Sequence, residues 1–249
     1  NAGATPFVFP VIDIVPRALT AGDEAIIAEL DRYQAVICIS APAAELGVRL
    51  CADRWPQWPL HQKWYAVGPA SGKPLQGWGL SLHVAEAGST SETLLALPEL
   101  QNVTEQRFLI LRGEGGRETL ADTLRSRGAQ VDYLELYERR SAVNDPACLA
   151  AFLLAPPPRV AITTSRESLD HLLLQAKAQA PSQADALRVC PLIVVSGRLA
   201  QHACQQGFSD VHIAAGASDE ALLESLQTLL LKSTAASTPT STSLPTRPT

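Results

Sequence analysis

A cluster of glycines between two arginines is the part of the sequence best suited to chemistry. It reads RGEGGRE and places Gly113, Gly115 and Gly116 between Arg112 and Arg117. Glycine adopts backbone conformations that other residues resist, so this segment predicts a tight turn. A glycine turn that joins a parallel strand to a helix presents free backbone amides, which open α/β sheets use to bind anions. We therefore predict an anion-binding turn in which these amides act beside the two arginines.

The flanking sequence supplies the strand and the helix that such a turn requires. Residues 108–111 form a short apolar run of the buried-strand type. Two leucines four positions apart then follow on one face of a predicted helix, and Gly128 is placed to end it. Residues 131–137 predict a second strand. The whole segment is thus expected to form a strand, a turn, a helix and a strand.

Strands alternate with helices along the rest of the chain, which indicates parallel sheets and an α/β fold. An extended segment, interrupted by Pro10, is expected at 7–14. Further strands are predicted at 35–40, 64–67, 81–84, 160–163, 191–195 and 211–214, and helices at 23–30, 41–51, from 71, 91–97, 145–154, 169–178, 199–206 and 218–231.

The two halves of the chain resemble each other in the order of their turns. ISAPA matches TTSRE, AVGPAS matches VVSGRLA, and GWGLSLHVAEAGSTSETLLA matches QGFSDVHIAAGASDEALLES. This order favours two similar α/β domains that bring their turns to one cleft. The alternative is that any parallel α/β fold repeats in this way. Residues 233–249 are almost entirely Ser, Thr, Pro and Ala, which predicts a disordered tail.

Composition narrows the possible partners and the cellular setting. A net charge of −5 and a pI near 5.6 argue against nucleic acid as a partner. No apolar run approaches the roughly 18 residues that span a membrane. The five cysteines form no CxxC pair, which predicts reduced thiols in a cytoplasmic protein, and the five histidines lack metal-ligand spacing. The chain contains no methionine, so we expect that an N-terminal piece is missing.

Several segments together resemble the uroporphyrinogen-III synthases, in their bacterial form. They are LILRGEGGRETLADTLRSRGAQV with LYERR, YAVGPAS, ITTSRESLDHLL and VVSGRLAQHACQQGF. The resemblance implies two flavodoxin-like parallel-sheet domains joined by a two-stranded linker, with the active-site cleft between them. It implies a first domain built from 1–12 plus 140–232, and a second from 13–139. The family's first strand and helix, with a Thr-Arg-Pro-like turn, have no counterpart here.

The resemblance also implies a reaction. Family members take the linear tetrapyrrole hydroxymethylbilane, remove water, and close the ring with inversion of ring D through a spiro intermediate, giving uroporphyrinogen III. The implied enzyme is a cyclising hydro-lyase of heme, siroheme and cobalamin biosynthesis that uses no cofactor and no metal. It is expected to be a cytoplasmic monomer that binds no nucleic acid and no membrane. Its expected partners are the polycarboxylate substrate and, transiently, the preceding enzyme of the pathway.

Tyr137 is the residue to which the resemblance assigns a chemical role. Its place in LYERR matches the family tyrosine that faces the cleft, and a phenol can donate a proton to a departing hydroxyl. The alternative is a tyrosine that packs at a hinge. Hydroxyls, amides and arginines in the turns would bind the carboxylates. The expected substrate-binding residues are Ser40, Ser71, Arg112, Gly113, Gly115, Arg117, Thr164, Ser165, Ser196, Gly197 and Arg198.

Three of these residues have plainer alternatives. Ser71 could be a helix cap, Arg117 could belong to a surface ion pair, and Arg112 could pair with Glu114 or another local acid. The chain as a whole also has two alternatives. One is a two-domain protein that binds a small anion without catalysis. The other is a regulatory or nucleotide-binding module, which is weakly supported because GxGxxG and GxxxxGK[ST] are both absent.

Overall fold

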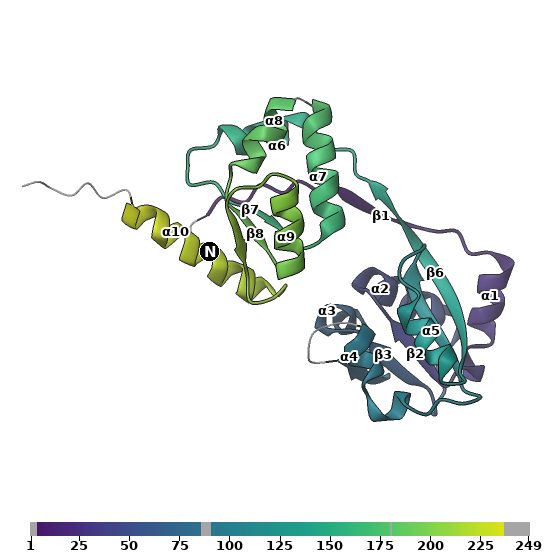
Figure 1. Ribbon diagram of the computed structural model, residues 1–249. Coiled ribbons are helices and arrows are strands. Elements are labelled where there is room, and N and C mark those ends of the chain that lie inside the picture. The colour runs from purple at the N-terminus through teal and green to yellow at the C-terminus, as the bar shows by residue number, and fades with distance from the viewer. Residues whose placement is uncertain (1–3, 86–90, 180, 237–249) are drawn as a thin grey trace, which may run out of the picture. The chain divides into compact units, whose positions relative to one another are not determined.

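The computed structural model describes residues 4–85, 91–179 and 181–236 (Figure 1). The chain divides into two compact units, which we treat separately. Unit 1 comprises Asn1–Ile12 and Ser141–Thr249, and unit 2 comprises Asp13–Arg140. The chain passes from one unit to the other twice, in β1 (Ile12–Pro16) and in β6 (Gln130–Ser141). Unit 2 is therefore inserted into the sequence of unit 1.

Unit 2 is built on a six-stranded sheet in the order β1-β6-β5-β2-β3-β4. Strands β2 to β6 are mutually parallel where they pair. Strand β1 is antiparallel to β6. Arg17 N–H donates to Leu136 O at 2.9 Å, and Ala142 N–H donates to Val11 O at 3.1 Å, so the residue numbers run in opposite directions. The remaining strands are β2 (Ala35–Cys38), β3 (Lys63–Ala66), β4 (Ser81–Val84) and β5 (Arg107–Gly113).

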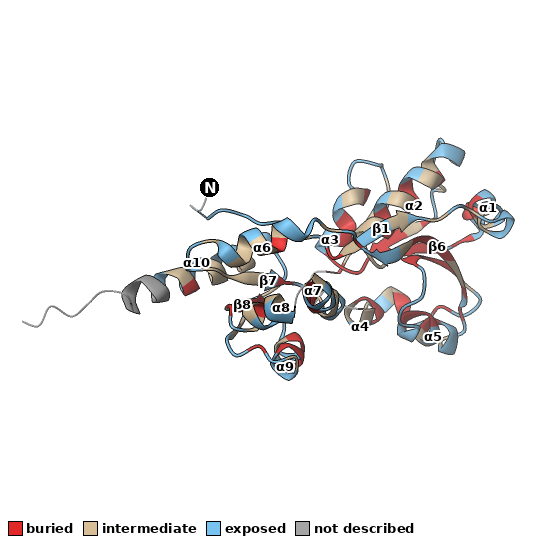
Figure 2. Cartoon of the chain, turned by 90° about the horizontal axis from the view of Figure 1, so that it is seen from above, coloured by how far each residue is buried: buried red, intermediate tan, exposed pale blue. Residues whose placement is uncertain are grey.

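Each face of this sheet has its own apolar cluster, because alternate strand residues point to opposite faces. Val36 and Leu109 join one cluster, with residues of α2, whereas Ile37 and Ile110 join the other, with residues of α4 and α5. Buried residues, red in Figure 2, mark the strands and parts of the covering helices. The helices are α1 (Ala21–Ala28), α2 (Ala41–Arg54), α3 (Pro69–Gly72), α4 (Ser91–Leu95) and α5 (Thr119–Ser126), with 3-10 turns at Leu30–Arg32, Lys73–Leu75 and Pro98–Leu100.

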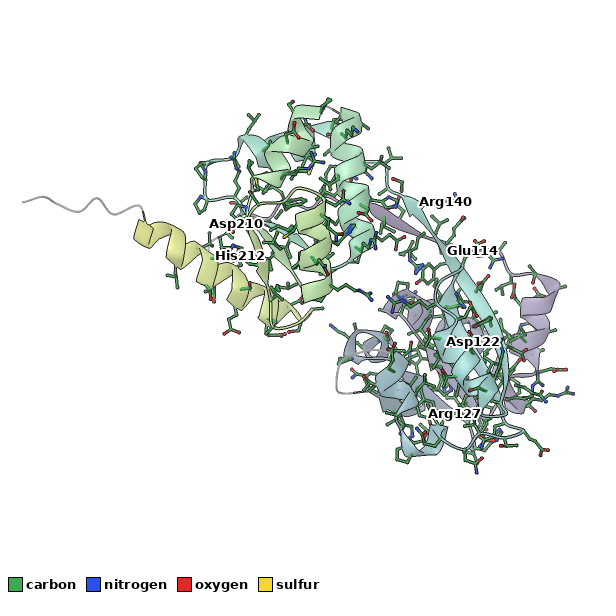
Figure 3. The ribbon with its side chains drawn as sticks, viewed as in Figure 1. Glu114, Asp122, Arg127, Arg140, Asp210 and His212 are labelled. Carbon is green, nitrogen blue, oxygen red and sulfur yellow. The ribbon has the colours of Figure 1, made fainter. Side chains whose placement is uncertain are left out.

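The strand, turn and helix predicted around the glycine cluster are confirmed. Helix α5 ends at Ser126, and Gly128 just beyond it has a φ of 87°, in the left-handed region that favours glycine. Just before it, Arg127 donates to the carbonyls of Leu95 at 2.9 Å and Leu100 at 2.7 Å (Figure 3). This arginine ties the end of α5 to the segment after α4, and so fixes the helix that follows the turn.

Unit 1 contains a three-stranded parallel sheet in the order β7-β8-β9. Its central strand is fully buried, as expected for a parallel strand covered on both faces. The strands are β7 (Ala161–Thr163), β8 (Leu192–Val194) and β9 (Val211–Ile213), and the helices are α6 (Pro146–Leu154), α7 (Arg166–Gln179), α8 (Pro181–Arg188), α9 (Gly197–Gln205) and α10 (Asp219–Ala236).

The N-terminal segment is held to the rest of unit 1 by specific contacts. Gln175 of α7 donates to the carbonyls of Val11 at 3.4 Å and Ala142 at 3.0 Å. The rings of Phe7 and Phe152 meet edge to face, with centroids 5.8 Å apart. These contacts explain why a segment so distant in sequence belongs to this unit.

The predicted alternation of strands and helices is confirmed, with differences at particular elements. The extended segment predicted at 7–14 becomes a strand only from Ile12. Helix α8 was not predicted, because it is short and buries only two of its residues. The predicted disordered tail is wrong for residues 233–236, which continue α10 because no Gly or Pro interrupts that helix. The rest of that prediction, 237–249, lies outside the described residues. Within the described ranges, none of the helices combines the length and apolarity needed to cross a bilayer.

Candidate functional site

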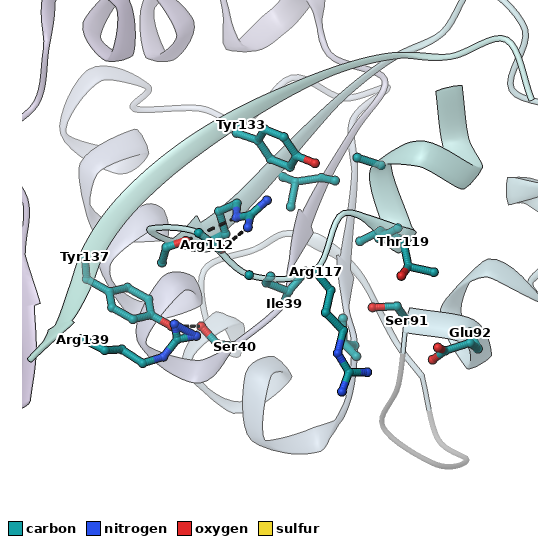
Figure 4. A pocket seen from close by; sticks show the side chains of 17 residues that line it. Ile39, Ser40, Ser91, Glu92, Arg112, Arg117, Thr119, Tyr133, Tyr137 and Arg139 are labelled. Atoms are coloured by element: carbon teal, nitrogen blue, oxygen red, sulfur yellow. Dashed lines mark hydrogen bonds between the residues drawn. The ribbon is translucent and has the colours of Figure 1, made fainter. Parts of the chain in front are cut away.

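A pocket of about 300 Å³ lies in unit 2 beside the glycine turn, near β2, β5 and β6 (Figure 4). Its lining includes the turn that follows β5, the start of α2 and the second half of β6. The carboxyl edge of a parallel sheet is where open α/β folds place their ligands. The pocket brings together six of the predicted site residues, namely Ser40, Arg112, Gly113, Gly115, Arg117 and Tyr137.

A β-bulge directs Tyr137 into this pocket. Strand β6 pairs with β5 in regular register up to Arg112 and Glu135, but Gly113 then lies opposite Tyr137, so β6 has one extra residue. Tyr137 consequently packs in the same apolar cluster as Leu136, although neighbours in a regular strand face opposite sides. The shifted register is closed by a hydrogen bond from Glu114 N–H to Tyr137 O at 2.7 Å. Bulges commonly re-aim a side chain beside an active site.

Gly113 provides the space that the Tyr137 ring occupies. A Cβ atom at this position would lie 2.6 Å from ring atoms Cε2 and Cζ and 3.0 Å from the phenolic oxygen. The predicted glycine turn is confirmed by Gly115 and Gly116, whose φ values are 69° and 106°. The φ of Gly113 lies outside the left-handed region, so this position does not need glycine for its backbone conformation. Gly113 is thus required for close packing, and the other two glycines for the turn.

Ser40 lies directly against the phenol of Tyr137. The two hydroxyl oxygens are 3.0 Å apart, and the dashed line in Figure 4 marks this contact. Ser40 is also the N-cap of α2, and its oxygen accepts the N–H of Ala43 at 3.2 Å. The phenolic oxygen therefore lies near the positive end of a 14-residue helix.

The contacts of Arg112 favour an internal role. Its side chain is only 2% exposed, and Nη1 lies 2.8 Å from Glu118 Oε1. Nε donates to Gly113 O at 3.3 Å, and Nη2 donates to Gly115 O. The guanidinium also lies 4.5 Å from the centroid of the Tyr133 ring. Arg112 thus pairs with a local acid, although that acid is Glu118 and not Glu114, and it binds the turn from inside.

The acid that pairs with Arg112 is held in its charged form. A hydrogen bond from the Tyr133 hydroxyl lowers the pKa of Glu118, and the bond from Arg112 lowers it further. Conversely, burial raises the pKa of Tyr133, and its bond to Glu118 raises it further. The anionic Glu118 compensates the positive charge of Arg112, whose carbonyl bonds hold the backbone of the turn.

Two further arginines that line the pocket are exposed. Arg117 extends into it from the glycine turn, and Arg139 lies beside Tyr137 on β6 (Figure 4). The Arg139 guanidinium is 5.7 Å from the centroid of the Tyr137 ring. Arg139 was not among the residues predicted from the sequence. Its position two residues after Tyr137, on one face of a strand, was the signal that could have found it.

Ser71 lies apart from the pocket. It is buried within α3, and it lines neither of the two cavities described here. The N-cap of α3 is Gly68, so the alternative of Ser71 as the helix cap is wrong.

The remaining predicted residues lie in the strand-to-helix turns of unit 1. The Ser165 hydroxyl accepts the N–H of Ser168 at 3.0 Å, and the Ser196 hydroxyl caps α9 by accepting the N–H of Leu199 at 3.2 Å. Thr164 lines a cavity of about 1190 Å³ in this unit, whose walls are mostly apolar. Exposed Gly197 and Arg198 begin α9.

The chain is thus a two-unit parallel α/β protein with a cationic pocket at the edge of a sheet. Comparison with known proteins identifies its family. The family model described as uroporphyrinogen-III synthase HemD matches residues 1–224. The uroporphyrinogen-III synthases of Escherichia coli K12 and Salmonella typhimurium LT2 are 32% and 35% identical over 228 residues, covering 90% of this chain and 91% of each relative. The chain belongs to the uroporphyrinogen-III synthase family.

Solved structures show the same fold. A mutant uroporphyrinogen III synthase from the extremely thermophilic bacterium Thermus thermophilus superposes with a TM-score of 0.58 at 17% identity, covering 94% of this chain and 91% of that one. The Helicobacter pylori uroporphyrinogen-III synthetase gives a TM-score of 0.56 at 19% identity, with 88% and 91% covered.

The comparisons confirm the resemblance seen in the motifs. The chain is a cyclising lyase of porphyrin biosynthesis, and the alternative of a binding protein without catalysis is not favoured.

Proposed function

We propose that the pocket of unit 2 is where this enzyme acts on hydroxymethylbilane, with Tyr137 as the group that protonates the departing hydroxyl. The observation that carries this proposal is the placement of the Tyr137 phenol. It is directed into the pocket by a bulge, fitted against Gly113 and bonded to Ser40. Loss of hydroxide from the substrate requires a proton donor within hydrogen-bond reach. The phenol is a group of that kind, and it lines the pocket.

The size of the pocket indicates how much of the substrate it holds. Its volume of about 300 Å³ lies at the lower end of the roughly 300–1,000 Å³ of typical ligand sites. A linear tetrapyrrole is much larger than this. We therefore propose that the pocket receives the terminal ring that bears the hydroxymethyl group, and that the other rings bind outside it.

Charge supports the same assignment. The acetate and propionate side chains of a pyrrole are anions, and arginine binds carboxylates through paired N–H groups. Arg117 and Arg139 both line the pocket and both are exposed. We propose that they bind the carboxylates of the enclosed ring. The amide of Gly115 already donates to Glu135 Oε1 at 3.2 Å, so Gly115 would reach the ligand only by exchanging that partner. Arg112 would act indirectly, by holding the turn.

The turns of unit 1 are proposed to bind carboxylates of the remaining rings. The hydroxyls of Ser165 and Ser196 already serve their own helices, so their contribution would come mainly from backbone amides at the helix starts. Hydrogen-bonding groups alone can orient a flexible substrate for ring closure, where positioning matters more than strong acid or base. The residues proposed for this role are Thr164, Ser165, Ser196, Gly197 and Arg198, with Ser71 in unit 2.

The proposed enzyme needs no cofactor and no metal, and it works in the cytoplasm as a monomer with transient contact to the preceding enzyme. In the described part of the chain, no three His, Cys, Asp or Glu side chains are grouped to hold a metal ion. The five cysteines are free in the structure.

The decisive assay separates the cyclised isomers. Freshly generated hydroxymethylbilane closes spontaneously to uroporphyrinogen I, without inversion of ring D. With the full chain present, we expect uroporphyrinogen III in excess when the products are resolved by chromatography. Tyr137→Phe should lower kcat by roughly 10²- to 10⁴-fold, the range of general acid catalysis, with a smaller effect on KM. Type I product alone would contradict the activity, and near-normal turnover by Tyr137→Phe would remove this residue as the proton donor.

A further inference from the structure

The hydroxyl of Ser40 is the nearest polar partner that the structure gives the phenol of Tyr137. The oxygens are 3.0 Å apart, within the normal range for a hydrogen bond between hydroxyls. Either oxygen could be the donor on distance alone. The direction of this bond matters, because it decides whether the phenolic proton points at Ser40 or into the pocket.

The other bond of Ser40 leaves its proton free for donation to Tyr137. A serine hydroxyl has one proton to donate and two lone pairs that accept. One lone pair accepts the N–H of Ala43 at 3.2 Å, as the cap of α2. The Ser40 proton is therefore available for the oxygen of Tyr137, and that bond leaves the phenolic proton for a group in the pocket.

The surroundings keep the phenol in this position. The Tyr137 ring is 3% exposed and rests against Gly113, where even a Cβ atom would overlap it. The guanidinium of Arg139 lies 5.7 Å from the ring centroid, on the side of the pocket. A ring fixed in this way presents its oxygen to Ser40 in one orientation.

We infer that Ser40 is a positioning residue for the reaction. It donates its proton to the Tyr137 oxygen, directs the phenolic proton toward the departing hydroxyl, and stabilises the phenolate that results. This inference rests on the proposed role of Tyr137. In the sequence, Ser40 looks like an ordinary helix cap, and its contact with Tyr137 becomes visible only in the structure.

The proposed step conserves atoms and electrons. The phenolic proton moves to the substrate hydroxyl, and the C–O bond breaks with its electron pair on the oxygen that leaves as water. The substrate remains as a cationic azafulvene, and Tyr137 as a phenolate that accepts the hydrogen bond from Ser40 beside the positive end of α2. Closure of the ring releases one proton from a pyrrole carbon, which restores the phenol.

The test begins with a variant that removes the hydroxyl and spares the helix. Glycine is nearly as good an N-cap as serine, so Ser40→Gly should start α2 normally. We expect kcat to fall roughly 10- to 100-fold, the worth of a hydrogen bond to a charged group, with KM little changed. Ser40→Thr, which keeps both the hydroxyl and the cap, should restore turnover. Thr20→Gly removes the equivalent cap of α1, where Thr20 Oγ1 accepts the N–H of Asp23 at 3.2 Å, and should leave turnover unchanged.

A double-mutant cycle then separates positioning from mere structure. If Ser40 acts through Tyr137, Ser40→Gly should cost nothing further in a Tyr137→Phe background, and the fraction of type III product should be unchanged. An equal loss of kcat in both backgrounds, or a rise in KM as the main effect, would overturn the inference while leaving the role of Tyr137 intact. Full activity of Tyr137→Phe alone would overturn the proposed role of Tyr137, and the inference with it.

Discussion

Close packing between Gly113 and Tyr137 makes this glycine as important to the site as any hydrogen-bonding residue. A glycine in a strand usually marks a place where another group approaches the backbone. Here that group is the Tyr137 ring, and the missing side chain is what lets the bulge bring the phenol over the backbone of β5. The space at residue 113 therefore determines where the phenol of Tyr137, the proposed proton donor, lies.

Gly113→Ala should reveal this coupling. The added methyl group would displace the Tyr137 ring, and we expect the free energy of unfolding to fall by about 1–3 kcal/mol, as for other overpacked cores. Turnover should fall more steeply, roughly 10- to 100-fold, because misplacement by about 1 Å is costly in catalysis. Isomer-resolved kinetics and thermal unfolding would measure the two effects.

A matched control is available in the same unit. A Cβ atom at Gly72 would lie 2.7 Å from Val84 Cγ2, a comparable overlap away from the pocket. Gly72→Ala should therefore lose stability in a similar way and keep its turnover. Equal turnover in the two variants would show that Gly113 has no special link to Tyr137.

Residues of the site were predictable from sequence to the extent that local pattern determines them. The glycine spacing indicated the turn and its two arginines. The bulge was not predictable, because it depends on the register between β5 and β6, and so the packing role of Gly113 was missed as well. Arg139 was accessible to simple counting along the strand. The division of labour between Arg112 and Arg117 became visible only when burial was known.

At the scale of elements, one arginine holds the glycine turn in place and another extends from it into the pocket. Arg112 binds the carbonyls of Gly113 and Gly115 and pairs with Glu118 at the edge of α5, while Arg117 projects from the other side of the same turn. Arg112 thus stabilises the connection between β5 and α5, and Arg117 adds a positive charge that is accessible to a ligand.

Two lysine substitutions should separate these roles. Lysine keeps the charge but has one nitrogen, so Arg112→Lys should lose about two of its hydrogen bonds and roughly 1–3 kcal/mol of unfolding free energy. Arg117→Lys should leave stability unchanged and raise KM several-fold, because paired contact with a carboxylate is lost. Denaturant unfolding and steady-state kinetics of both variants provide the check. The reverse pattern would mean that Arg112 contacts the substrate and Arg117 supports the fold.

The elements themselves were predicted where short apolar runs and turn residues define them. The prediction of β6 stopped at Tyr137, but the strand continues to Ser141 through charged residues. Its extension comes from pairing with β1, more than 100 positions earlier in the sequence, which no local pattern reveals. Helix α8 was missed for a similar reason, since its packing on α7 is tertiary and it buries only two of its own residues.

At the scale of the whole molecule, unit 2 contains all the described residues that line the pocket and both apolar clusters of its sheet. A compact region with its own core is expected to fold alone. The fragment Asp13–Arg140 should therefore unfold cooperatively on heating, as followed by circular dichroism. It should produce no excess of uroporphyrinogen III, because the proposed carboxylate sites of unit 1 are absent. Excess type III from the fragment would show that unit 1 is dispensable for the reaction.

The insertion of one unit into the other also sets a timetable during synthesis. The segment that carries Phe7 leaves the ribosome before its partners Phe152 and Gln175, which lie beyond residue 140. About 130 residues of unit 2 come between, which at ~5–20 residues per second takes roughly 6 to 26 s. During that interval the inserted unit can form its sheet, while the segment that carries Phe7 has no unit 1 residues to pack against. Its aromatic side chains therefore stay without their contacts in unit 1 until the residues beyond 140 have been synthesised.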